Sequence, residues 1–424
     1  MTDLALLELE RRHAPRLLDD SLRLGERHAP AFETELRCIG VEPDAVPDAV
    51  AATRALAIRL DQVPATIATR LALREPGLLP EGHSVRAWTA PTGDDLHTLV
   101  LAGNEPDLRH LADLLPAADS AADGVARMIA LMLSRRAAHT FTLTCPGGQQ
   151  LIADECRPLI MGVVNVTPDS FSDGGQFLDE DAAVAHGMQL VEEGADLLDI
   201  GGESTRPGAA EVSAEDECAR VLPVIQRLAS DSGVPISIDS TKSEVVRAAL
   251  DAGATIINDV SGFAPDRSDR PGGGLAALAA AFGTPCILMH MQGTPRTMQS
   301  DPQYQDLMAE LCAFFRERTA GLVRMGVPRE QIVLDPGFGF GKAQAHNLEM
   351  LRRFREFASL GQPLMAGMSR KSMLGRIGGG DVTDRVPESL AVHLIASLAG
   401  AQLLRVHDVR EMRKVVAVRN ALAG

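Results

Sequence analysis

The chain has 424 residues, 45% of them apolar, and a formal net charge of −16. A chain of this length can bury one large core or two, and its acidic balance argues against a nucleic-acid-binding protein. The six cysteines form no Cys-x-x-Cys pair, so they predict reduced thiols in the cytoplasm and argue against a disulfide frame or a cysteine zinc site.

The N-terminal region, residues 1–140, predicts a small α+β domain whose role cannot be read from its residue types. Strand candidates lie at 54–60, 84–90 and 96–103, and helix candidates at 64–75 and 106–115. They follow one another in β-α-β-β-α order. The opening "MTDLALLELERRHAP" has no uninterrupted apolar stretch, so it predicts neither a signal peptide nor a membrane anchor.

A hairpin is predicted next, over residues 141–158. Two short strands flank Pro146, Gly147 and Gly148, which are turn-forming residues. We expect this hairpin to plug one end of the domain that follows.

Residues 159–424 repeat one pattern: a short run of Val, Ile and Leu, a polar or glycine-rich stretch, and a stretch of helical period. Runs without strict alternation are typical of parallel strands buried on both faces. The Gly-x-Gly-x-x-Gly motif of an open doubly wound sheet is missing after the first run. The pattern therefore favours an α/β fold, a (β/α)8 TIM barrel. The eight apolar runs lie at 159–167, 197–203, 235–239, 255–260, 285–291, 331–337, 363–369 and 403–408, with helix candidates at 181–194, 243–253, 347–361 and 387–400.

Each of the eight apolar runs has a polar residue at or near its end. The carboxyl ends of barrel strands surround one mouth, where the active sites of this architecture lie. A single polar residue after a strand is most simply a loop-capping side chain, but eight of them predict a functional site. They are Asn165, Glu203, Asp239, Asn258, His290, Asp335, Ser369 and His407.

Four side chains at these tips would suit a flat nitrogenous ring. Asp239 and Asp335 can each accept paired N–H bonds, Asn258 can both donate and accept, and Lys371 can donate to a ring carbonyl and nitrogen. Such a set matches the edge of an aminopyrimidinone heterocycle.

Two loops and a group of cations predict a phosphate site at the same mouth. Asn165 begins the loop "VTPDSFSDGG", and its neutral oxygen suits a Mg²⁺ ion that also bridges phosphates. Arg206, in "GGESTRPG", offers a planar fork for an anion, although it would equally pair with Glu203 or Glu211 as a surface salt bridge. Further positive charge comes from Arg370, Lys371, Arg405 and His407.

The barrel segments closely resemble the dihydropteroate synthases, enzymes of folate synthesis that bind a pterin in a (β/α)8 barrel. The resemblance covers residues 159–424 and rests on "MGVVNVTPDSFSDGG", "LLDIGGESTRPGA", "SIDS", "INDVSG", "LMHMQGTPRTMQ", "LDPGFGFGK", "GMSRKSMLG" and "LLRVHDV". Departures are small: Ser240 stands where threonine is common, and the loop after the fourth strand is longer. Residues 1–140 resemble an N-terminal extension found on some bacterial members.

The resemblance implies a role for each matching residue. Two loops, 168–176 and 204–211, are implied to close over the ligands as lids, and Mg²⁺ is implied at Asn165. The catalytic set is Asp239, Lys371, Arg405 and His407. The implied pterin site consists of Asp239, Asn258, Asp335, Lys371 and Arg405, the p-aminobenzoate site of Phe171, Thr205, Pro207, Phe340, Ser369 and Lys371, and the pyrophosphate site of Asn165, Arg206, Arg405 and His407.

The implied reaction joins dihydropterin pyrophosphate to p-aminobenzoate, giving 7,8-dihydropteroate and pyrophosphate by an SN1-like substitution. A homodimer through the last helices is implied as well. Two alternatives stay open: a methyltetrahydrofolate-dependent corrinoid methyltransferase, which needs no diphosphate clamp, and a catalytically silent pterin-binding paralogue. Release of pyrophosphate would separate the three.

Overall fold

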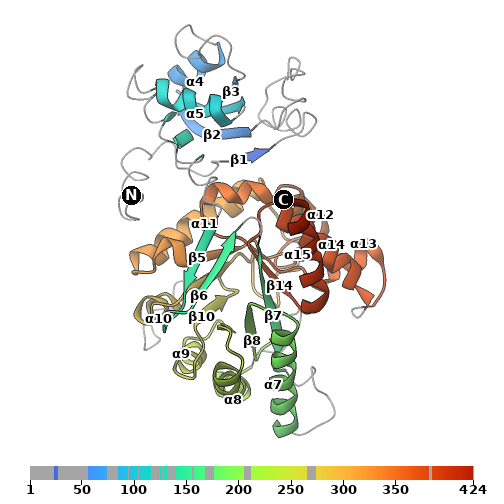
Figure 1. Cartoon of the computed structure of the whole chain (residues 1–424). Coiled ribbons are helices and arrows are strands. Elements are labelled where there is room, and N and C mark those ends of the chain that lie inside the picture. The colour runs from blue at the N-terminus through green and yellow to red at the C-terminus, as the bar shows by residue number, and fades with distance from the viewer. Residues whose placement is uncertain are drawn as a thin grey trace. The chain divides into compact units, whose positions relative to one another are not determined.

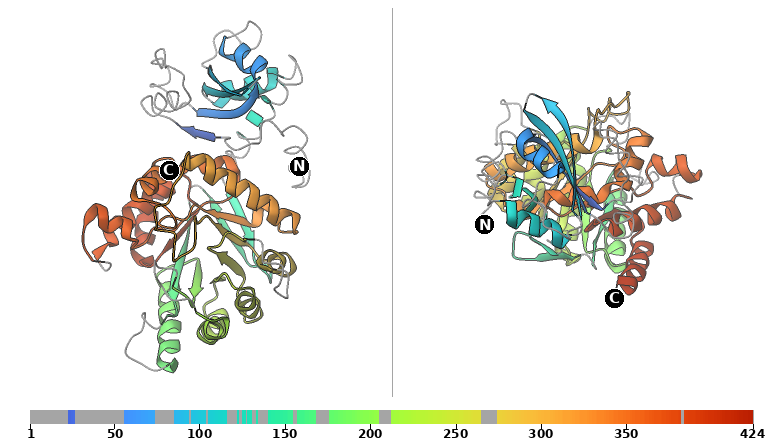
Figure 2. Two further views of the ribbon diagram at one scale, coloured as in Figure 1. Left: turned by 180° about the vertical axis from the view of Figure 1, so that it is seen from behind. Right: turned by 90° about the horizontal axis from the view of Figure 1, so that it is seen from above.

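The computed structural model describes residues 23–26, 56–73, 85–93, 95–103, 105–115, 122, 125–126, 128–130, 133, 140–154, 157–167, 176–204, 212–264, 274–381 and 384–423. Its contacts divide the chain into two compact units (Figures 1 and 2). One comprises Met1–Ala138, Gln305–Arg316 and Arg353–Gly361, and the other comprises His139–Tyr304, Glu317–Arg352 and Gln362–Gly424. Within the described ranges, no helix has the length and apolar content that a membrane span requires.

The N-terminal residues form a four-stranded antiparallel sheet of order β1-β2-β4-β3. Its core is apolar: Ile67 and Leu71 lie on the buried side of the first helix, and Leu99 and Leu101 alternate along β4. The predicted β-α-β-β-α order is present, and β1 is an edge strand that was not predicted. The elements are β1 (Arg23–Glu26), β2 (Leu56–Pro64), α4 (Ala65–Ala72), β3 (Arg86–Gly93), β4 (Leu96–Gly103) and α5 (Glu105–Leu114).

The larger unit contains an eight-stranded parallel sheet of order β12-β11-β10-β9-β8-β7-β14-β13. A parallel bridge between Leu334 and Leu364 joins β12 to the residue before β13, so the sheet curls into a nearly closed barrel. All eight predicted strands are confirmed, and so is the TIM-barrel fold. The strands are β7 (Leu159–Asn165), β8 (Leu197–Gly201), β9 (Ile236–Asp239), β10 (Ile256–Asp259), β11 (Cys286–Met289), β12 (Ile332–Asp335), β13 (Met365–Ala366) and β14 (Leu403–Val406).

Helices lie outside these strands (Figure 1). The helix α8 shows why they form: Ser213 caps its N-terminus by accepting from the Asp216 N–H, and Val221, Ile225 and Leu228 bury one face. The set is α7 (Gln176–Glu192), α8 (Ala214–Asp231), α9 (Ser243–Asp251), α10 (Gly274–Phe282), α11 (Leu307–Arg324), α12 (Gln344–Arg352), α13 (Ser372–Gly378), α14 (Val386–Leu398) and α15 (Val409–Ala423), with 3-10 helices η3 (Arg329–Gln331) and η4 (Phe354–Leu360).

The helix predicted over 347–361 is divided in two. α12 ends at Arg352, and a separate 3-10 helix, η4, follows and stops at Gly361, which has a φ of 78°. The sequence pattern is continuous across both elements, so it predicted a single helix. It does not reveal that the chain tightens into a 3-10 turn where Phe354 and Phe357 are buried.

The hairpin of β5 (Thr140–Thr144) and β6 (Gln150–Asp154) packs against the ends at which the barrel strands begin. Gln331, just before β12, ties it there by bonding the Thr144 N–H and the Thr142 carbonyl. The opposite end, where the strands finish, carries the polar residues. One apolar cluster contains the hairpin side chains and the first residues of the strands: Leu143, Cys145, Leu151, Ala153, Leu159, Met161, Leu197, Ile256, Ile287, Val333, Met365 and Leu403.

Candidate active site

The mouth at the carboxyl ends of the strands gathers the predicted polar residues. Asn165, Asp239 and Asp335 are the last residues of β7, β9 and β12, and His407 directly follows β14. Since all eight strands are parallel, these residues lie at the same end of the barrel.

A charged network centred on Arg405 occupies the mouth. Arg405 Nε donates to Asp199 Oδ2 at 2.7 Å, and Arg405 Nη2 donates to Asp239 Oδ2 at 2.9 Å. Asn258 Nδ2 also donates to Asp199 Oδ2, at 3.1 Å. Residues from β8, β9, β10 and β14 are therefore joined by three hydrogen bonds, which fix the orientation of the guanidinium.

Asp199 is a residue of this network that the sequence patterns did not predict. Its side chain is fully buried, and its Oδ1 has no hydrogen-bond partner within the described residues. A signal was present in the sequence: Asp199 is the one charged residue inside the apolar run "LLDI", and a carboxylate in such a run must find a partner because an unpaired buried charge is very costly.

Burial and neighbouring charges shift the pKa of Asp239. Burial and the nearby Asp199 carboxylate raise its pKa to about 7, although the Arg405 guanidinium opposes the shift. Asp239 therefore changes its protonation state near neutral pH, as acid–base groups in enzyme active sites often do.

Lys371 contacts two residues of the loop after β12. Its Nζ donates to the Phe338 carbonyl at 2.5 Å and lies 4.5 Å from the centroid of the Phe340 ring. Burial lowers the pKa of Lys371 to about 8, and the nearby Asp335 carboxylate opposes this shift. Burial also raises the pKa of Asp335, against the Lys371 charge.

Gly367, which follows β13, lies next to both Arg405 and Asp335. A Cβ at Gly367 would lie 3.8 Å from Arg405 Cβ and 3.9 Å from Asp335 Oδ2. Asp335 and Arg405 are thus neighbours across the backbone that follows β13. The structure therefore brings Asp239, Asn258, Asp335, Lys371 and Arg405 to one place, with Asp199 added.

Beyond β13 and β14, His407 pairs with Ser369. His407 Nδ1 lies 2.9 Å from Ser369 Oγ, and the His407 backbone N–H donates to the same oxygen at 3.1 Å. Arg370 does not contribute free charge here, contrary to expectation. Its guanidinium donates to both carboxylate oxygens of Asp408, at 3.1 and 2.5 Å, so that charge is neutralised locally.

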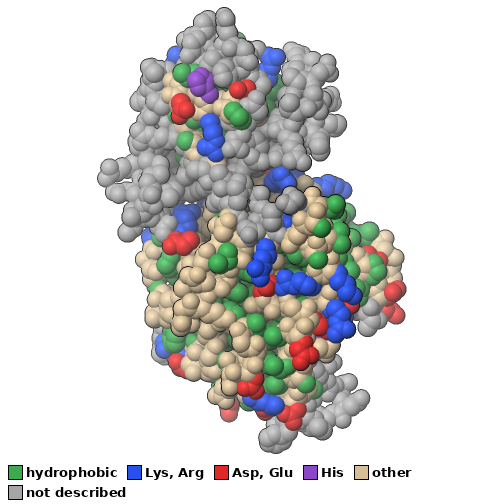
Figure 3. All heavy atoms as spheres, viewed as in Figure 1, with side chains coloured by type: hydrophobic (Ala, Val, Ile, Leu, Met, Phe, Trp, Pro, Cys, Tyr) green, Lys and Arg blue, Asp and Glu red, His purple; other side chains and the backbone are tan. Residues whose placement is uncertain are grey.

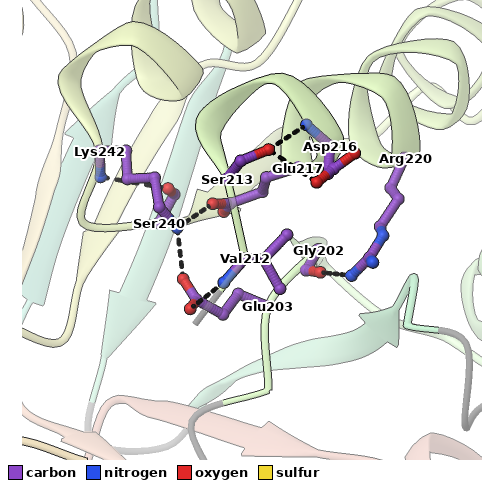
Figure 4. Close-up of polar contacts among 9 residues, drawn as sticks. All are labelled: Gly202, Glu203, Val212, Ser213, Asp216, Glu217, Arg220, Ser240 and Lys242. Carbon is purple, nitrogen blue, oxygen red and sulfur yellow. Dashed lines mark hydrogen bonds and ion pairs between the residues drawn. The ribbon is translucent and has the colours of Figure 1, made fainter. Parts of the chain in front are cut away.

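Two predicted tip residues are engaged away from the network. His290 is buried, and its Nδ1 lies 2.9 Å from the Nζ of the buried Lys342. Glu203 binds Lys242, which also binds the fully buried Glu217 at 2.6 Å (Figure 4). Phe171, Thr205, Arg206 and Pro207 lie outside the described residues, as do nearly all of the segments 168–176 and 204–211.

The donor set for a metal ion is sparse in the described part of the chain. It contains no group of three or more His, Cys, Asp or Glu side chains placed to hold one. The half-buried Asn165 amide ends β7, next to β14, which leads into His407. With a single neutral oxygen from the protein, a Mg²⁺ ion here would need water and substrate phosphates as its other ligands.

The barrel and its site are similar to those of known pterin-binding enzymes. A model of the family described as pterin binding enzyme matches residues 161–407. The dihydropteroate synthase of Escherichia coli strain K12 is 47% identical over 268 residues, which are 63% of this chain and 93% of that protein. The dihydropteroate synthase of Synechocystis is 44% identical over 280 residues, 65% of this chain and 94% of that protein.

Solved structures agree with the sequence relatives. The Xanthomonas albilineans dihydropteroate synthase with 4-aminobenzoic acid is 45% identical, has a TM-score of 0.61 and covers 67% of this chain and 99% of its own. The Yersinia pestis dihydropteroate synthase in a sulfonamide drug complex is 44% identical, with a TM-score of 0.61 and coverage of 66% and 99%. The Xanthomonas enzyme in complex with 7,8-dihydropteroate is 43% identical, with a TM-score of 0.58 and coverage of 67% and 99%.

Proposed function

Because this chain belongs to the pterin-binding enzyme family, we propose that it catalyses the dihydropteroate synthase reaction. It joins 6-hydroxymethyl-7,8-dihydropterin diphosphate to p-aminobenzoate and releases 7,8-dihydropteroate and pyrophosphate, a step of folate synthesis. Relatives named dihydropteroate synthase are matched over more than nine tenths of their length, which supports the whole reaction and not a fragment of it.

One observation carries this proposal: Arg405 joins Asp199 and Asp239, with Asn258 bonded to the same network and Asp335 and Lys371 beside it. A pterin ring needs carboxylates for its amino and ring N–H groups and donors for its carbonyl and unprotonated nitrogen. The set supplies both kinds within one barrel mouth. Asp239, Asn258, Asp335, Lys371 and Arg405 form the proposed pterin site.

In the proposed mechanism the C–O bond at the pterin methylene breaks first. Positive charge then spreads into the ring, and the Asp239 carboxylate stabilises it electrostatically. The weakly basic aryl amine attacks the methylene carbon and afterwards loses a proton, so no side chain acts as a nucleophile. Asp239, Lys371, Arg405 and His407 are the proposed catalytic residues, with Asp199 holding the Arg405 guanidinium in place.

The departing pyrophosphate is proposed to meet Asn165, Arg206, Arg405 and His407. Arg405 uses Nε and Nη2 for the two carboxylates, and the guanidinium carries further N–H donors for a phosphate oxygen. We also propose that Asn165 contributes one ligand to a substrate-bound Mg²⁺, which would neutralise charge on the leaving group.

The p-aminobenzoate site is proposed on the Phe340 side of the mouth. The Lys371 ammonium over the Phe340 ring provides an apolar surface with a cation next to it, which suits an aromatic carboxylate. Ser369 lies nearby along the chain, held by His407. Phe171, Thr205 and Pro207 complete the proposed set, and the relatives solved with 4-aminobenzoic acid and a sulfonamide support this ligand class.

We further propose a cytoplasmic homodimer. Four large apolar side chains are exposed on the last two long helices, namely Ile395, Leu398, Val418 and Leu422 at 49%, 55%, 61% and 84%. Figure 3 shows hydrophobic and basic side chains interspersed over the helices α12–α15 on the face it draws. A second copy would cover the apolar ones. The described cysteines, Cys145, Cys218, Cys286 and Cys312, are free thiols, which suits a reducing compartment.

Product analysis tests the reaction. The purified chain is incubated with the dihydropterin diphosphate, p-aminobenzoate and Mg²⁺, and pyrophosphate and 7,8-dihydropteroate are measured. We expect both products in equal amounts, and a loss of several orders of magnitude in Asp239→Ala. A corrinoid methyltransferase or a silent pterin binder would form no pyrophosphate, so its absence would overturn the proposal.

A further inference from the structure

Two polar side chains on the buried side of α14 have no part in the mechanism above, yet both bond the loop that carries Lys371. This loop is formed by residues 367–371, between β13 and α13. Ser389 and His393 are buried and lie about one helical turn apart on α14. A polar side chain at such a place needs a hydrogen-bond partner, because an unpaired one is costly to bury.

Ser389 bonds the loop at Arg370. The Ser389 Oγ accepts from the Arg370 backbone N–H at 2.9 Å and donates to the Arg385 carbonyl at 2.7 Å. Arg385, the residue before α14, donates in turn from Nη1 to the Arg370 carbonyl at 3.2 Å. Both backbone groups of Arg370 are therefore held by the first residues of α14 and the residue before it.

The backbone of Arg370 adopts a conformation that needs such support. Its φ is 56°, in the left-handed region, which is unfavourable for a residue with a Cβ atom. Lys371 is the next residue, and its Nζ reaches the Phe338 carbonyl from there. Loss of the bonds from α14 would therefore favour relaxation of this turn and displacement of Lys371.

His393 bonds the same loop two residues earlier, at Met368. Its Nδ1 lies 2.7 Å from the Ser389 carbonyl, which can only accept, so Nδ1 carries the proton. In the neutral ring Nε2 is then an acceptor, and the Met368 N–H donates to it at 3.3 Å. Burial lowers the pKa of His393 to about 4, so the ring is neutral near pH 7.

Ser369 lies between the two residues that α14 holds, Met368 and Arg370. The Ser369 Oγ accepts from the His407 backbone N–H at 3.1 Å, and it lies 2.9 Å from His407 Nδ1. The loop is thus bonded both to α14 and to the residue after β14. Since α14 bonds the loop through its backbone, any effect on the ligands passes through the side chains that the loop carries.

We propose that Ser389 and His393 are positioning residues: by fixing the loop backbone they hold Lys371 in the barrel mouth. This inference rests on the proposed function, which assigns Lys371 to catalysis and Ser369 to the p-aminobenzoate site. Removal of either side chain should displace Lys371 and leave it chemically intact. The consequence is a slower reaction in which Lys371 has a different environment.

The basic limb of the pH profile reports that environment. Burial lowers the pKa of Lys371 to about 8, and the charges that act on it are Asp335 on β12, Arg405 on β14 and Asp239 on β9. When the loop loosens, water reaches the ammonium group, so its pKa rises towards the ordinary value for lysine and the basic limb moves to higher pH. Partial unfolding alone would lower the rate without moving this limb.

Three variants of the full chain test the inference: Ser389→Ala, His393→Leu and His393→Gln. Ser389→Ala and His393→Leu should each lower kcat/KM for the dihydropterin diphosphate about tenfold and move the basic limb to higher pH. His393→Gln should recover most of the activity, because its amide oxygen can accept from the Met368 N–H. Ser389→Ala removes a single oxygen atom, so it tests the inference even if His393→Leu does not fold.

Ser397→Ala is the matched control. Ser397 is another buried serine of α14, and its Oγ donates to the Leu394 carbonyl of the same helix at 2.9 Å. Its loss should leave kcat/KM and the basic limb unchanged. An unchanged basic limb in Ser389→Ala, or an equal shift in Ser397→Ala, would overturn the inference.

Hydrogen exchange provides a readout that does not need catalysis. The Arg370 amide should exchange faster in Ser389→Ala, and the Met368 amide in His393→Leu, than in the wild type and in Ser397→Ala. Unchanged exchange at both amides would also contradict the inference. Absence of pyrophosphate release by the wild type would instead overturn the proposed function, so the two failures are distinguishable.

Discussion

Arg405 and Asp239 are joined at 2.9 Å across the barrel mouth, from the penultimate residue of β14 to the last residue of β9. The same guanidinium holds the buried Asp199 at 2.7 Å. One cation thus faces two carboxylates. Such an arrangement keeps Arg405 charged and lets one carboxylate, Asp239, titrate near neutrality.

The first prediction is a bell-shaped pH dependence of kcat/KM for the dihydropterin diphosphate. Asp239, with a pKa of about 7, is neutral at lower pH and charged above it, so the acid limb should fall near 7. Lys371, with a pKa of about 8, loses its charge at higher pH, so the basic limb should fall near 8. The profile is measured from about pH 5 to about pH 10.

Asp239→Asn is the control for that profile, because it removes the group assigned to the acid limb. An unchanged acid limb in Asp239→Asn would contradict the assignment. Folding stability should respond in the opposite direction to activity over this pH range. The raised folded pKa of Asp239 means that its contribution to stability is fully present below the unfolded pKa and is lost as the pH rises through about 7.

The second prediction concerns Asp199→Asn. The amide can still accept from Arg405 and Asn258 through its oxygen, and its N–H group takes the place of Oδ1, which has no partner in the described structure. The fold should therefore persist, while kcat/KM should fall by about 10- to 100-fold because the guanidinium loses a charged partner. Turnover and thermal unfolding are measured together.

The pH profile of Asp199→Asn distinguishes positioning from general damage. The Asp199 charge raises the pKa of Asp239, so its removal should move the acid limb to lower pH. Loss of activity without this shift would mean that Asp199 acts only on the packing of the mouth.

The third prediction is that Arg370, unlike His407, does not bind pyrophosphate. Arg370 is paired with Asp408, so Arg370→Ala should lower the free energy of unfolding by about 1–2 kcal/mol and change kcat/KM little. His407→Ala should instead reduce kcat/KM by about a hundredfold, as expected for a lost contact to the leaving group. The two variants are compared in one steady-state assay, and a similar large loss in both would restore Arg370 to the pyrophosphate site.

The fourth prediction tests the homodimer. Replacing Leu398 and Val418 by Asp would add charge to the exposed apolar side chains of α14 and α15. Sedimentation equilibrium should then report a monomer, and the wild type a dimer. Ile152→Asp, on the exposed side of β6 and 50% exposed, is the matched control and should stay dimeric. A monomeric wild type would refute the proposed association.

The sequence by itself determined the barrel and most of the polar residues that the structure brings together at its mouth. The eight apolar runs, their order and the polar residue after each one are local properties, since strand period and turn chemistry are set by neighbours in the chain. The termini of parallel strands meet by topology alone, so the sequence predicts that Asp239, Asn258, Asp335 and Lys371 share one mouth. Relatives with the same motifs support this reading.

Only the tertiary structure decided which charges face one another. Asp199 and Arg405 are 206 positions apart, and nothing local indicates that they meet at 2.7 Å. Arg370 and Lys371 are adjacent in the chain, yet the first faces Asp408 and the second faces Asp335. Lys242 likewise finds Glu203 and Glu217 only after three β/α units have packed. The energy of an ion pair depends on the distance between the charges and on their burial, and both are fixed only when the barrel has folded.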